Sequence, residues 1–251
     1  MLETRGLSVR FGGHVAVDAV SCAFAPGTLT AIVGPNGAGK TTYFNLISGQ
    51  LKATSGEVML NGQSLAGLSP SARTRAGLGR AFQLTNLFPN LSVLENVRLA
   101  VQATQAGPHR RGLNLWSIWC DHTALTERAE NILQEVAMTE QAHQPVSSLP
   151  HGDQRKLEVA LLMALEPQVY MFDEPTAGMS ADEAPVILNL IRRLKATNLY
   201  TILLVEHKMD VVRELADRIV VLHNGQCVAD GLPQDVMASA IVQQAYLGKR
   251  A

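Results

Sequence analysis

The sequence predicts an α/β fold with a parallel sheet and crossover helices, and three observations predict it. A glycine-rich segment lies between an apolar run typical of a buried strand, 29–33, and a helical run that begins near residue 43. Two further short apolar runs, 169–173 and 201–205, each end in charged residues. From about residue 165 onward, strand and helix patterns alternate, as a parallel sheet with crossover helices requires. The chain of 251 residues is long enough to bury a large core.

The first part of the chain indicates antiparallel strands. Residues 1–30 and 55–62 carry short alternating runs, with turn signals at Gly12-Gly13, Pro26-Gly27 and Asn61-Gly62. We expect these residues to form an antiparallel β subdomain beside the parallel sheet.

The glycine-rich segment from Gly34 to Thr42 is the most informative motif of the chain. We expect its three glycines to adopt positive φ and to turn backbone N–H groups inward at the N-terminus of the following helix. In this pattern Lys40 reaches the β- and γ-phosphates of a nucleotide, and the Thr41 hydroxyl binds Mg²⁺. A chance glycine-rich turn is the alternative, which the strand–loop–helix context disfavours. The motif therefore predicts a P-loop NTPase (RecA-like) core, in which the nucleotide is bound by Asn36, Gly37, Ala38, Gly39, Lys40, Thr41 and Thr42.

The ends of two later strands carry the other predicted catalytic groups. Asp173 is placed to hold Mg²⁺, and Glu174 follows it, where a carboxylate polarises an attacking water. His207 follows the run 201–205, and the ends of neighbouring parallel strands face one crevice. His207 is therefore a candidate γ-phosphate sensor, although a lone histidine is more often structural. The segment 207–210 lacks the Asn of the base-reading motif of GTPases, which disfavours a GTPase.

Helical signals dominate from Gln83 to about residue 165, so we expect an inserted helical subdomain over about 84–165. Ser92 and Glu95 form a capping box, and another helix is predicted from Gly152 to Leu165. A third helix has one apolar face, formed by Leu125, Ala129, Ile132, Leu133 and Val136.

The stretch 107–122 within this subdomain is harder to interpret. Its two tryptophans, Trp116 and Trp119, either pack along one buried helical face or form a patch for a membrane partner. We favour burial, because tryptophan contributes mainly through the area that it removes from water.

Taken in order with Gln83 and the segment 149–155 (LPHGDQR), these motifs resemble the ATPase subunit of an ABC transporter, and the resemblance covers essentially the whole chain. It implies one ABC ATPase domain over residues 1–251, with ATP and Mg²⁺ as cofactors. It further implies that Gln83 binds Mg²⁺ and touches the membrane partner, and that Phe11 stacks on adenine. Val17, in the same stretch, would also contact the nucleotide.

The resemblance also assigns a role to the signature segment, which would close over ATP bound by the opposite subunit. Its phosphate-facing residues would be Pro150, His151, Gly152 and Asp153. The usual signature has Ser where this chain has Pro150, so the hydroxyl that would contact the γ-phosphate is missing. Asp153 replaces a Gln-like residue, and its carboxylate repels phosphate unless it turns away to cap the helix.

The stretches 174–179, 206–209 and 245–248 resemble the ATPases of branched-chain amino acid importers, and 155–160 agrees with them. The resemblance therefore implies ATP hydrolysis that powers import of a small polar solute. Relatives that serve urea and short amides remain open. Lipid or lipopolysaccharide export, a soluble non-transport ABC protein and a non-hydrolysing regulator are the rivals. Lipid or lipopolysaccharide export lacks support in these stretches. Soluble ABC proteins carry two cassettes or a long coiled-coil insert, and this sequence shows neither.

The implied partners are membrane permease subunits, a second ATPase subunit and, indirectly, a solute-binding protein. A heterodimer of two different ATPases is favoured, with a homodimer left open. The chain would then lie peripherally on the cytoplasmic face of the inner or plasma membrane. A net charge of −1 and a pI near 6.7 give no global attraction to nucleic acid. The longest apolar run, 159–165, is too short to span a bilayer.

The cysteines and clustered basic residues give weaker indications. Cys22, Cys120 and Cys227 show no spacing typical of a metal or redox pair, which favours a reducing interior. Two small basic groups are interpreted as solvated or partner-facing surface, and they consist of Arg73, Arg75 and Arg80, and of His109, Arg110 and Arg111.

Overall fold

The computed structural model describes residues 1–81, 87–105, 122–239 and 242, which fall into two units. The first unit contains Met1–Arg80, Gln168–Glu174 and Leu194–Ala251, and the second contains Ala81–Pro167 and Pro175–Arg193. Several predictions lie outside the described residues: those for Gln83, for the start of the helical subdomain at 84, for Trp116 and Trp119, for His109, Arg110 and Arg111, and for 245–248.

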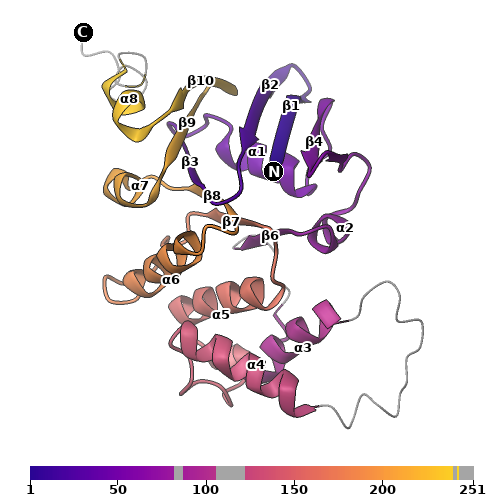
Figure 1. Ribbon diagram of the computed structural model, residues 1–251, viewed down its shortest axis with the longest axis vertical. Helices are drawn as coiled ribbons and strands as arrows, with labels where there is room; N and C mark the ends of the chain where they lie inside the picture. Colours follow the sequence, from indigo (N-terminus) through magenta and orange to yellow (C-terminus); the bar gives the residue numbers. More distant parts are fainter. Residues whose placement is uncertain (82–86, 106–121, 240–241, 243–251) are drawn as a thin grey trace. The chain divides into compact units, whose positions relative to one another are not determined.

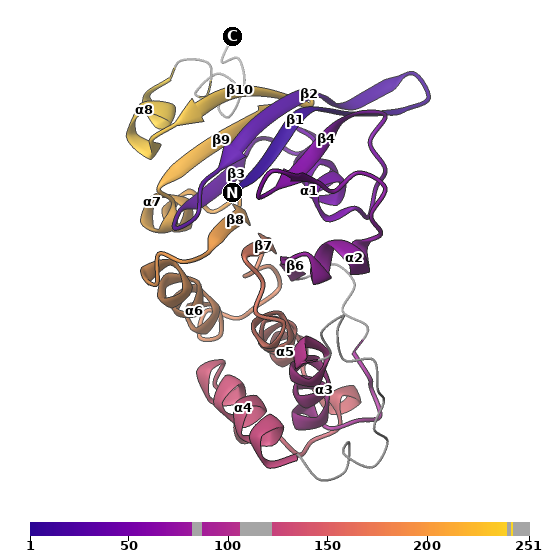
Figure 2. The same cartoon turned by 45° about the vertical axis from the view of Figure 1, so that its right-hand side comes forward.

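The first unit contains an antiparallel sheet at its N-terminal end, as the alternating pattern predicts (Figure 2). Its strands pair in the order β2-β1-β4-β5, with bounds β1 (Leu2–Phe11), β2 (His14–Phe24), β4 (Ser55–Leu60) and β5 (Gln63–Ser64). Phe11 pairs with His14 across the predicted turn at Gly12-Gly13. The strand that begins at Leu29 does not belong to this sheet.

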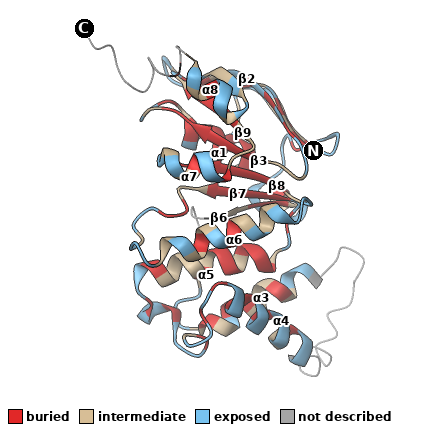
Figure 3. Cartoon of the chain, turned by 60° about the vertical axis from the view of Figure 1, so that its left-hand side comes forward, coloured by how far each residue is buried: buried red, intermediate tan, exposed pale blue. Residues whose placement is uncertain are grey.

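The second sheet of this unit is built around parallel strands (Figure 1). Its order is β10-β9-β3-β8-β7-β6, with bounds β3 (Leu29–Val33), β6 (Leu78–Ala81), β7 (Val169–Asp173), β8 (Thr201–Val205), β9 (Arg218–His223) and β10 (Gln226–Gly231). Strands β7, β8, β3 and β9 run parallel, and β10 returns antiparallel to β9. β3 and β8 are buried at every residue, as expected for strands covered on both faces (Figure 3).

Helices cover both faces of the parallel sheet. α1 (Lys40–Ser48) contributes Tyr43 and Phe44 to a core cluster that includes Ile32 and reaches strands of both sheets. The opposite face of β3, marked by Ala31, packs in a second cluster with α7 (Met209–Leu215) and α8 (Pro233–Ala238). Because β3, β7 and β8 run parallel, their carboxyl ends lie at one edge of the sheet.

The second unit is mainly helical. Its helices are α3 (Val93–Gln105), α4 (His122–Glu135), α5 (His151–Ala164) and most of α6 (Ala184–Ala196), with a short 3₁₀ turn at Val146–Ser148. The predicted capping box is present, because the Glu95 carboxylate accepts hydrogen bonds from the Ser92 N–H and hydroxyl. The predicted apolar face of α4 and the residue after it are buried, as Leu125, Ala129, Ile132, Leu133 and Val136. No described helix is both long and apolar enough to cross a membrane.

Two of the arginines interpreted as solvated surface are buried instead, and that interpretation is wrong for them. Arg73, on α2 (Pro70–Arg75), is 8% exposed and donates to the Leu46 and Ile47 carbonyls at the end of α1. The side chain of Arg80 is 5% exposed. Each guanidinium is buried because it meets fixed acceptors, which local sequence does not reveal.

Candidate functional site

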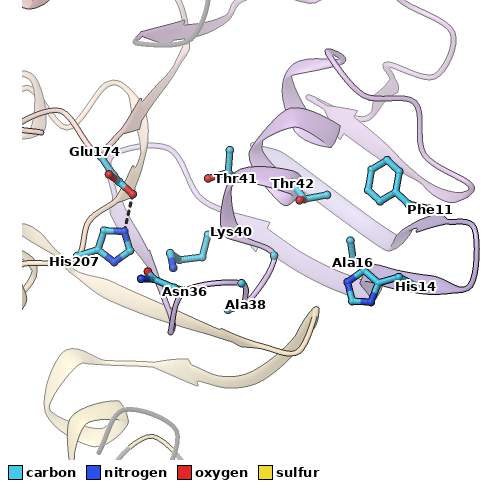
Figure 4. A pocket seen from close by; sticks show the side chains of 12 residues that line it. Phe11, His14, Ala16, Asn36, Ala38, Lys40, Thr41, Thr42, Glu174 and His207 are labelled. Atoms are coloured by element: carbon cyan, nitrogen blue, oxygen red, sulfur yellow. Dashed lines mark hydrogen bonds and ion pairs between the residues drawn. The ribbon is translucent and has the colours of Figure 1, made fainter.

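A cavity of about 410 Å³ lies at the carboxyl edge of the parallel strands within the first unit (Figure 4). Its size falls within the range of typical small-molecule sites. Most of the predicted nucleotide-binding and catalytic side chains line it. The lining residues are Phe11, His14, Ala16, Asn36, Gly37, Ala38, Gly39, Lys40, Thr41, Thr42, Glu174 and His207.

The glycine-rich loop has the backbone geometry that the motif predicts. Gly34, Gly37 and Gly39 have φ of 151°, 79° and 96°. A Cβ at Gly34 would lie 2.1 Å from the Leu222 carbonyl oxygen, so no other residue fits there. Gly39 caps α1 without any side-chain hydrogen bond, and no acidic residue lies in the first turn of this helix. The helix therefore presents its backbone N–H groups and its positive end to the cavity.

Lys40 supplies the positive side chain of this loop. Its Nζ donates to the carbonyl oxygens of Gly34 and Pro35 at 2.7 and 2.9 Å. Burial lowers the pKa of Lys40, and the carboxylates of Glu174 and Asp173 oppose that shift. The amino group is thus held beside the loop and within the field of both carboxylates.

Glu174 and His207 pair with each other at one end of the cavity, as Figure 4 shows. His207 Nε2 and Glu174 Oε1 are 2.6 Å apart, and both side chains are partly exposed. Glu174 has φ 52°, an uncommon conformation for a residue with a side chain, and its N–H donates to the Val205 carbonyl. Glu206 is buried, and its carboxylate accepts from the N–H groups of His207 and Lys208. These bonds fix the backbone that carries the Glu174–His207 pair, at the kind of strained position that gathers at functional sites.

Asp173 forms a buried ion pair with Arg80. Arg80 Nη2 lies 2.8 Å from Asp173 Oδ2, and the two side chains are 5% and 8% exposed. The other terminal nitrogen of Arg80 donates to oxygens of α1 and the following residues, namely Asn45 Oδ1, Ser48 Oγ and Gln50 Oε1. Burial lowers the pKa of Arg80, and the Asp173 charge opposes the shift. The orientation of Asp173 therefore depends on Arg80.

Arg80 was not among the predicted site residues. A weak signal was present, because Arg80 lies in a short run whose neighbours, Leu78 and Ala81, are apolar and buried. A charge inside such a strand needs a partner.

At the Phe11 end of the cavity, one prediction needs correction. Phe11 is 51% exposed and lines the cavity, whereas Val17 is fully buried in the core cluster. Successive residues of a strand point to opposite faces, so Val17 faces the core and Ala16 faces the cavity. His14 also lines the cavity, and the alternation along β2 was the signal for both.

The predicted metal ligands divide between described and undescribed residues. Thr41 lines the cavity. Asp173 is the last residue of β7, and the next residue in the sequence, Glu174, lines the cavity. A hydroxyl and a carboxylate are hard oxygen donors of the kind that Mg²⁺ takes. Gln83 lies outside the described residues.

The signature segment belongs to the second unit. Pro150 is the N-cap of α5 with φ −57°, and no side chain caps this helix. Asp153 does not turn back to cap it, because its carboxylate pairs with Lys156 at 2.8 Å. A Cβ at Gly152 would lie 2.1 Å from a carboxylate oxygen of Glu183, so this glycine is required by packing. The Ser180 N–H and hydroxyl lower the pKa of Glu183, which keeps that carboxylate ionised.

Comparison with known proteins agrees with this site. A family model described as ABC transporter matches residues 17–177. The chain is 37% identical over 250 residues to the high-affinity branched-chain amino acid transport ATP-binding protein LivG of Escherichia coli K12, covering 99% of this chain and 98% of LivG. It is 36% identical to BraF of Pseudomonas aeruginosa, which has the same description, with the same coverage of each chain.

Solved structures show the same fold. A nucleotide-free ATP-binding cassette from an ABC transporter matches with a TM-score of 0.81 and 28% identity, over 99% of each chain. An ATP-binding cassette in its ADP conformation matches with a TM-score of 0.80 at the same identity and coverage. The predicted α/β class with a P-loop core is thereby confirmed.

The buried Arg80–Asp173 pair gives a stability prediction. Arg80→Met leaves the Asp173 charge buried without its guanidinium, so we expect a loss of about 3–5 kcal/mol in the free energy of unfolding. Urea unfolding followed by circular dichroism measures it. The exposed pair of Arg128 and Glu166 is the matched control, and Arg128→Met should cost at most about 1 kcal/mol.

A double substitution separates the pair from packing effects. Arg80→Met with Asp173→Asn removes both charges and should recover a large part of the loss. An Arg80→Met variant that unfolds at the same urea concentration as the unmodified chain would show that Arg80 does not stabilise Asp173.

Proposed function

The chain belongs to the ABC transporter family as one of its ATPase subunits, and from this premise we propose that it hydrolyses ATP to power import of a small polar solute, branched-chain or related amino acids. The observation that carries the proposal is one cavity of the first unit, in which the phosphate loop, Glu174 and His207 come together. The relatives LivG and BraF, named for branched-chain amino acid transport, support the choice of solute class. We propose further that residues 1–251 form one ATPase domain.

We propose that ATP binds with its triphosphate on the loop from Asn36 to Thr42 and its adenine against Phe11. The exposed ring of Phe11 offers an aromatic face at one end of the cavity. The N–H groups at the start of α1 receive phosphate oxygens. Lys40 Nζ exchanges its two carbonyl acceptors for phosphate oxygens, and the new hydrogen bonds are stronger because both partners carry charge.

Hydrolysis then follows from the Glu174–His207 pair. Glu174 accepts a hydrogen bond from water and draws off its proton as the water oxygen bonds to the γ-phosphorus. The bond from that phosphorus to the bridging oxygen breaks, and ADP and phosphate result. His207 steadies the γ-phosphate. Since Glu174 Oε1 and His207 Nε2 are 2.6 Å apart, one side chain orients the other.

Mg²⁺ fits the oxygen donors of this site, and we propose that Thr41, Asp173 and Gln83 hold it. When bound, the ion offsets charge on the phosphates. Arg80 binds Asp173 through Oδ2, which determines how the carboxylate is turned.

The assembly that we propose pairs this chain with a second ATPase subunit, so that each ATP lies between one P-loop and the other subunit's signature. A heterodimer is favoured over a homodimer. The pair associates with membrane permease subunits, peripherally and on the cytoplasmic face, and a solute-binding protein delivers the solute. No nucleic acid is involved.

Reconstituted transport tests the function. The chain, its partner ATPase and their permeases are placed in proteoliposomes with the binding protein, and uptake of labelled leucine, urea and a short amide is measured. We expect ATP-dependent leucine uptake that is lost with Lys40→Ala. Uptake of urea or the amide alone would revise the solute, and ATP-dependent lipid movement without solute uptake would overturn import.

Glu174→Gln tests the proposed base. The amide keeps the size of the side chain but cannot take a proton, so we expect turnover to fall about 10²–10⁴-fold. ATP affinity should change little, whereas Lys40→Ala should weaken ATP binding itself. Phosphate release and ATP binding are measured on the same preparations. Turnover near that of the unmodified chain would remove Glu174 from the mechanism.

Pro150→Ser tests the departure in the signature segment. A Ser hydroxyl would add a hydrogen bond to the γ-phosphate held by the opposite subunit, worth about 1.5–3 kcal/mol. In a Glu174→Gln background with ATP and Mg²⁺, we expect Pro150→Ser to tighten the dimer about ten-fold or more. Analytical ultracentrifugation compares the two variants. Equal dimer populations would show that Pro150 is neutral.

A further inference from the structure

Two cysteines that are far apart in the sequence meet in the first unit. Cys22 lies on β2 and Cys227 on β10, and their sulfur atoms lie within 4.8 Å of each other and of an Asp230 carboxylate oxygen. Their sequence spacing indicated no pair, and it is the fold that brings them together. The two strands are tied together, because the Asp18 N–H donates to the Gly225 carbonyl at 2.9 Å.

The two thiols differ in environment. Cys22 is 6% exposed, and Cys227 is partly exposed. A hydrogen bond from Cys22 lowers the pKa of Cys227, and burial and the Asp230 carboxylate oppose that shift only in part. That hydrogen bond and burial raise the pKa of Cys22. Cys227 is therefore the more accessible and the more acidic thiol, and Cys22 is the shielded thiol behind it, which is the arrangement of an attacking and a resolving cysteine.

We propose that Cys22 and Cys227 form a dithiol oxidation site that closes to an intramolecular disulfide, with a low-molecular-weight disulfide such as oxidised glutathione as the oxidant. The Cys227 thiolate attacks one sulfur of the oxidant, whose other half leaves as a thiolate and takes up a proton. The Cys22 thiol then loses its proton and attacks the Cys227 sulfur of the mixed disulfide. The second thiol leaves, so the protein loses two hydrogens and the oxidant becomes two thiols.

The surroundings favour this chemistry over a bound metal ion. The Asp230 carboxylate is engaged by Arg218 through both oxygens, at 2.5 Å each. A cation that used Asp230 would have to break this pair, and without Asp230 the described cluster offers two sulfur ligands alone. Disulfide formation needs only the two sulfurs from the protein, and the oxidant comes from solution.

The cross-link would join the two sheets next to the phosphate loop. The turn that precedes Cys227 contains Gly225, whose N–H donates to the Ala38 carbonyl of that loop. The disulfide would close a long segment of chain and restrict the unfolded state. We therefore expect oxidation to raise the melting temperature by roughly 4–10 °C.

The test uses the full chain carrying Cys120→Ser, which removes the third cysteine. The reduced protein is treated with oxidised glutathione, and intact mass, peptide mapping and melting temperature are measured. We expect a loss of two hydrogens, a Cys22–Cys227 cross-linked peptide, and a rise in melting temperature that dithiothreitol reverses. Adding Cys22→Ser should leave a stable glutathione adduct on Cys227 with no rise.

Three outcomes would overturn the proposal. A glutathione adduct that persists on Cys227 while Cys22 stays free would show that the sulfurs do not reach each other. Failure of both thiols to react in the folded protein would show that the site is closed to oxidants. Stoichiometric Zn²⁺ binding that protects both thiols, stabilises the reduced protein and is lost with Asp230→Asn would assign a metal site instead.

Discussion

The close approach of backbone to backbone around the phosphate loop is the constraint on which the rest of the first unit depends. A Cβ at Gly34 would lie 2.1 Å from the Leu222 carbonyl of β9, and a Cβ at Gly39 would lie 2.5 Å from the Ala16 carbonyl of β2. The loop is thus held between the two sheets with no room for a side chain at either contact. Such packing fixes the direction of the loop's N–H groups, so little reorganisation remains when an anion is bound. The antiparallel sheet therefore shapes the phosphate site as well as carrying the aromatic ring of Phe11.

Charge pairing is the second organising feature, because each titratable group of the proposed mechanism has a protein partner. Lys40 donates hydrogen bonds to two loop carbonyls, Asp173 forms an ion pair with Arg80, and Glu174 pairs with His207. The Arg80 pair is buried, where removing one partner costs far more than it does at the surface. The Glu174–His207 pair is half exposed, so it can open at small cost. The site combines a rigid carboxylate at the end of β7 with an adjustable one directly after it.

The sequence predicted the local elements well, because their signals are local. The strand–loop–helix of the phosphate site, the Ser92–Glu95 capping box and the buried face of α4 all follow from short-range patterns of residue type. Contacts between distant residues could not be predicted in this way. Arg80 looks like a surface residue until the sheet order places it beside Asp173, and no local signal places Cys227 beside Cys22. The prediction for Val17 rested on the resemblance alone, whereas the structure buries this side chain in the core cluster.

The N-terminus of α5 illustrates how a departure from a motif can leave the fold intact while changing its chemistry. Proline has a suitable φ at the N-cap, so Pro150 allows α5 to begin where the motif predicts. It also leaves the first turn without a side-chain cap, and the backbone N–H groups there remain available to an anion. Two carboxylates oppose that anion: Asp153, partly offset by Lys156, and Glu183, held against Gly152. Because Gly152 has no room for a side chain, the Glu183 carboxylate stays next to the backbone that would meet the phosphate. The weak binding that we propose for this signature segment would therefore arise from its neighbours as well as from the missing hydroxyl. A partner subunit whose own signature is intact would leave this chain's P-loop unaffected.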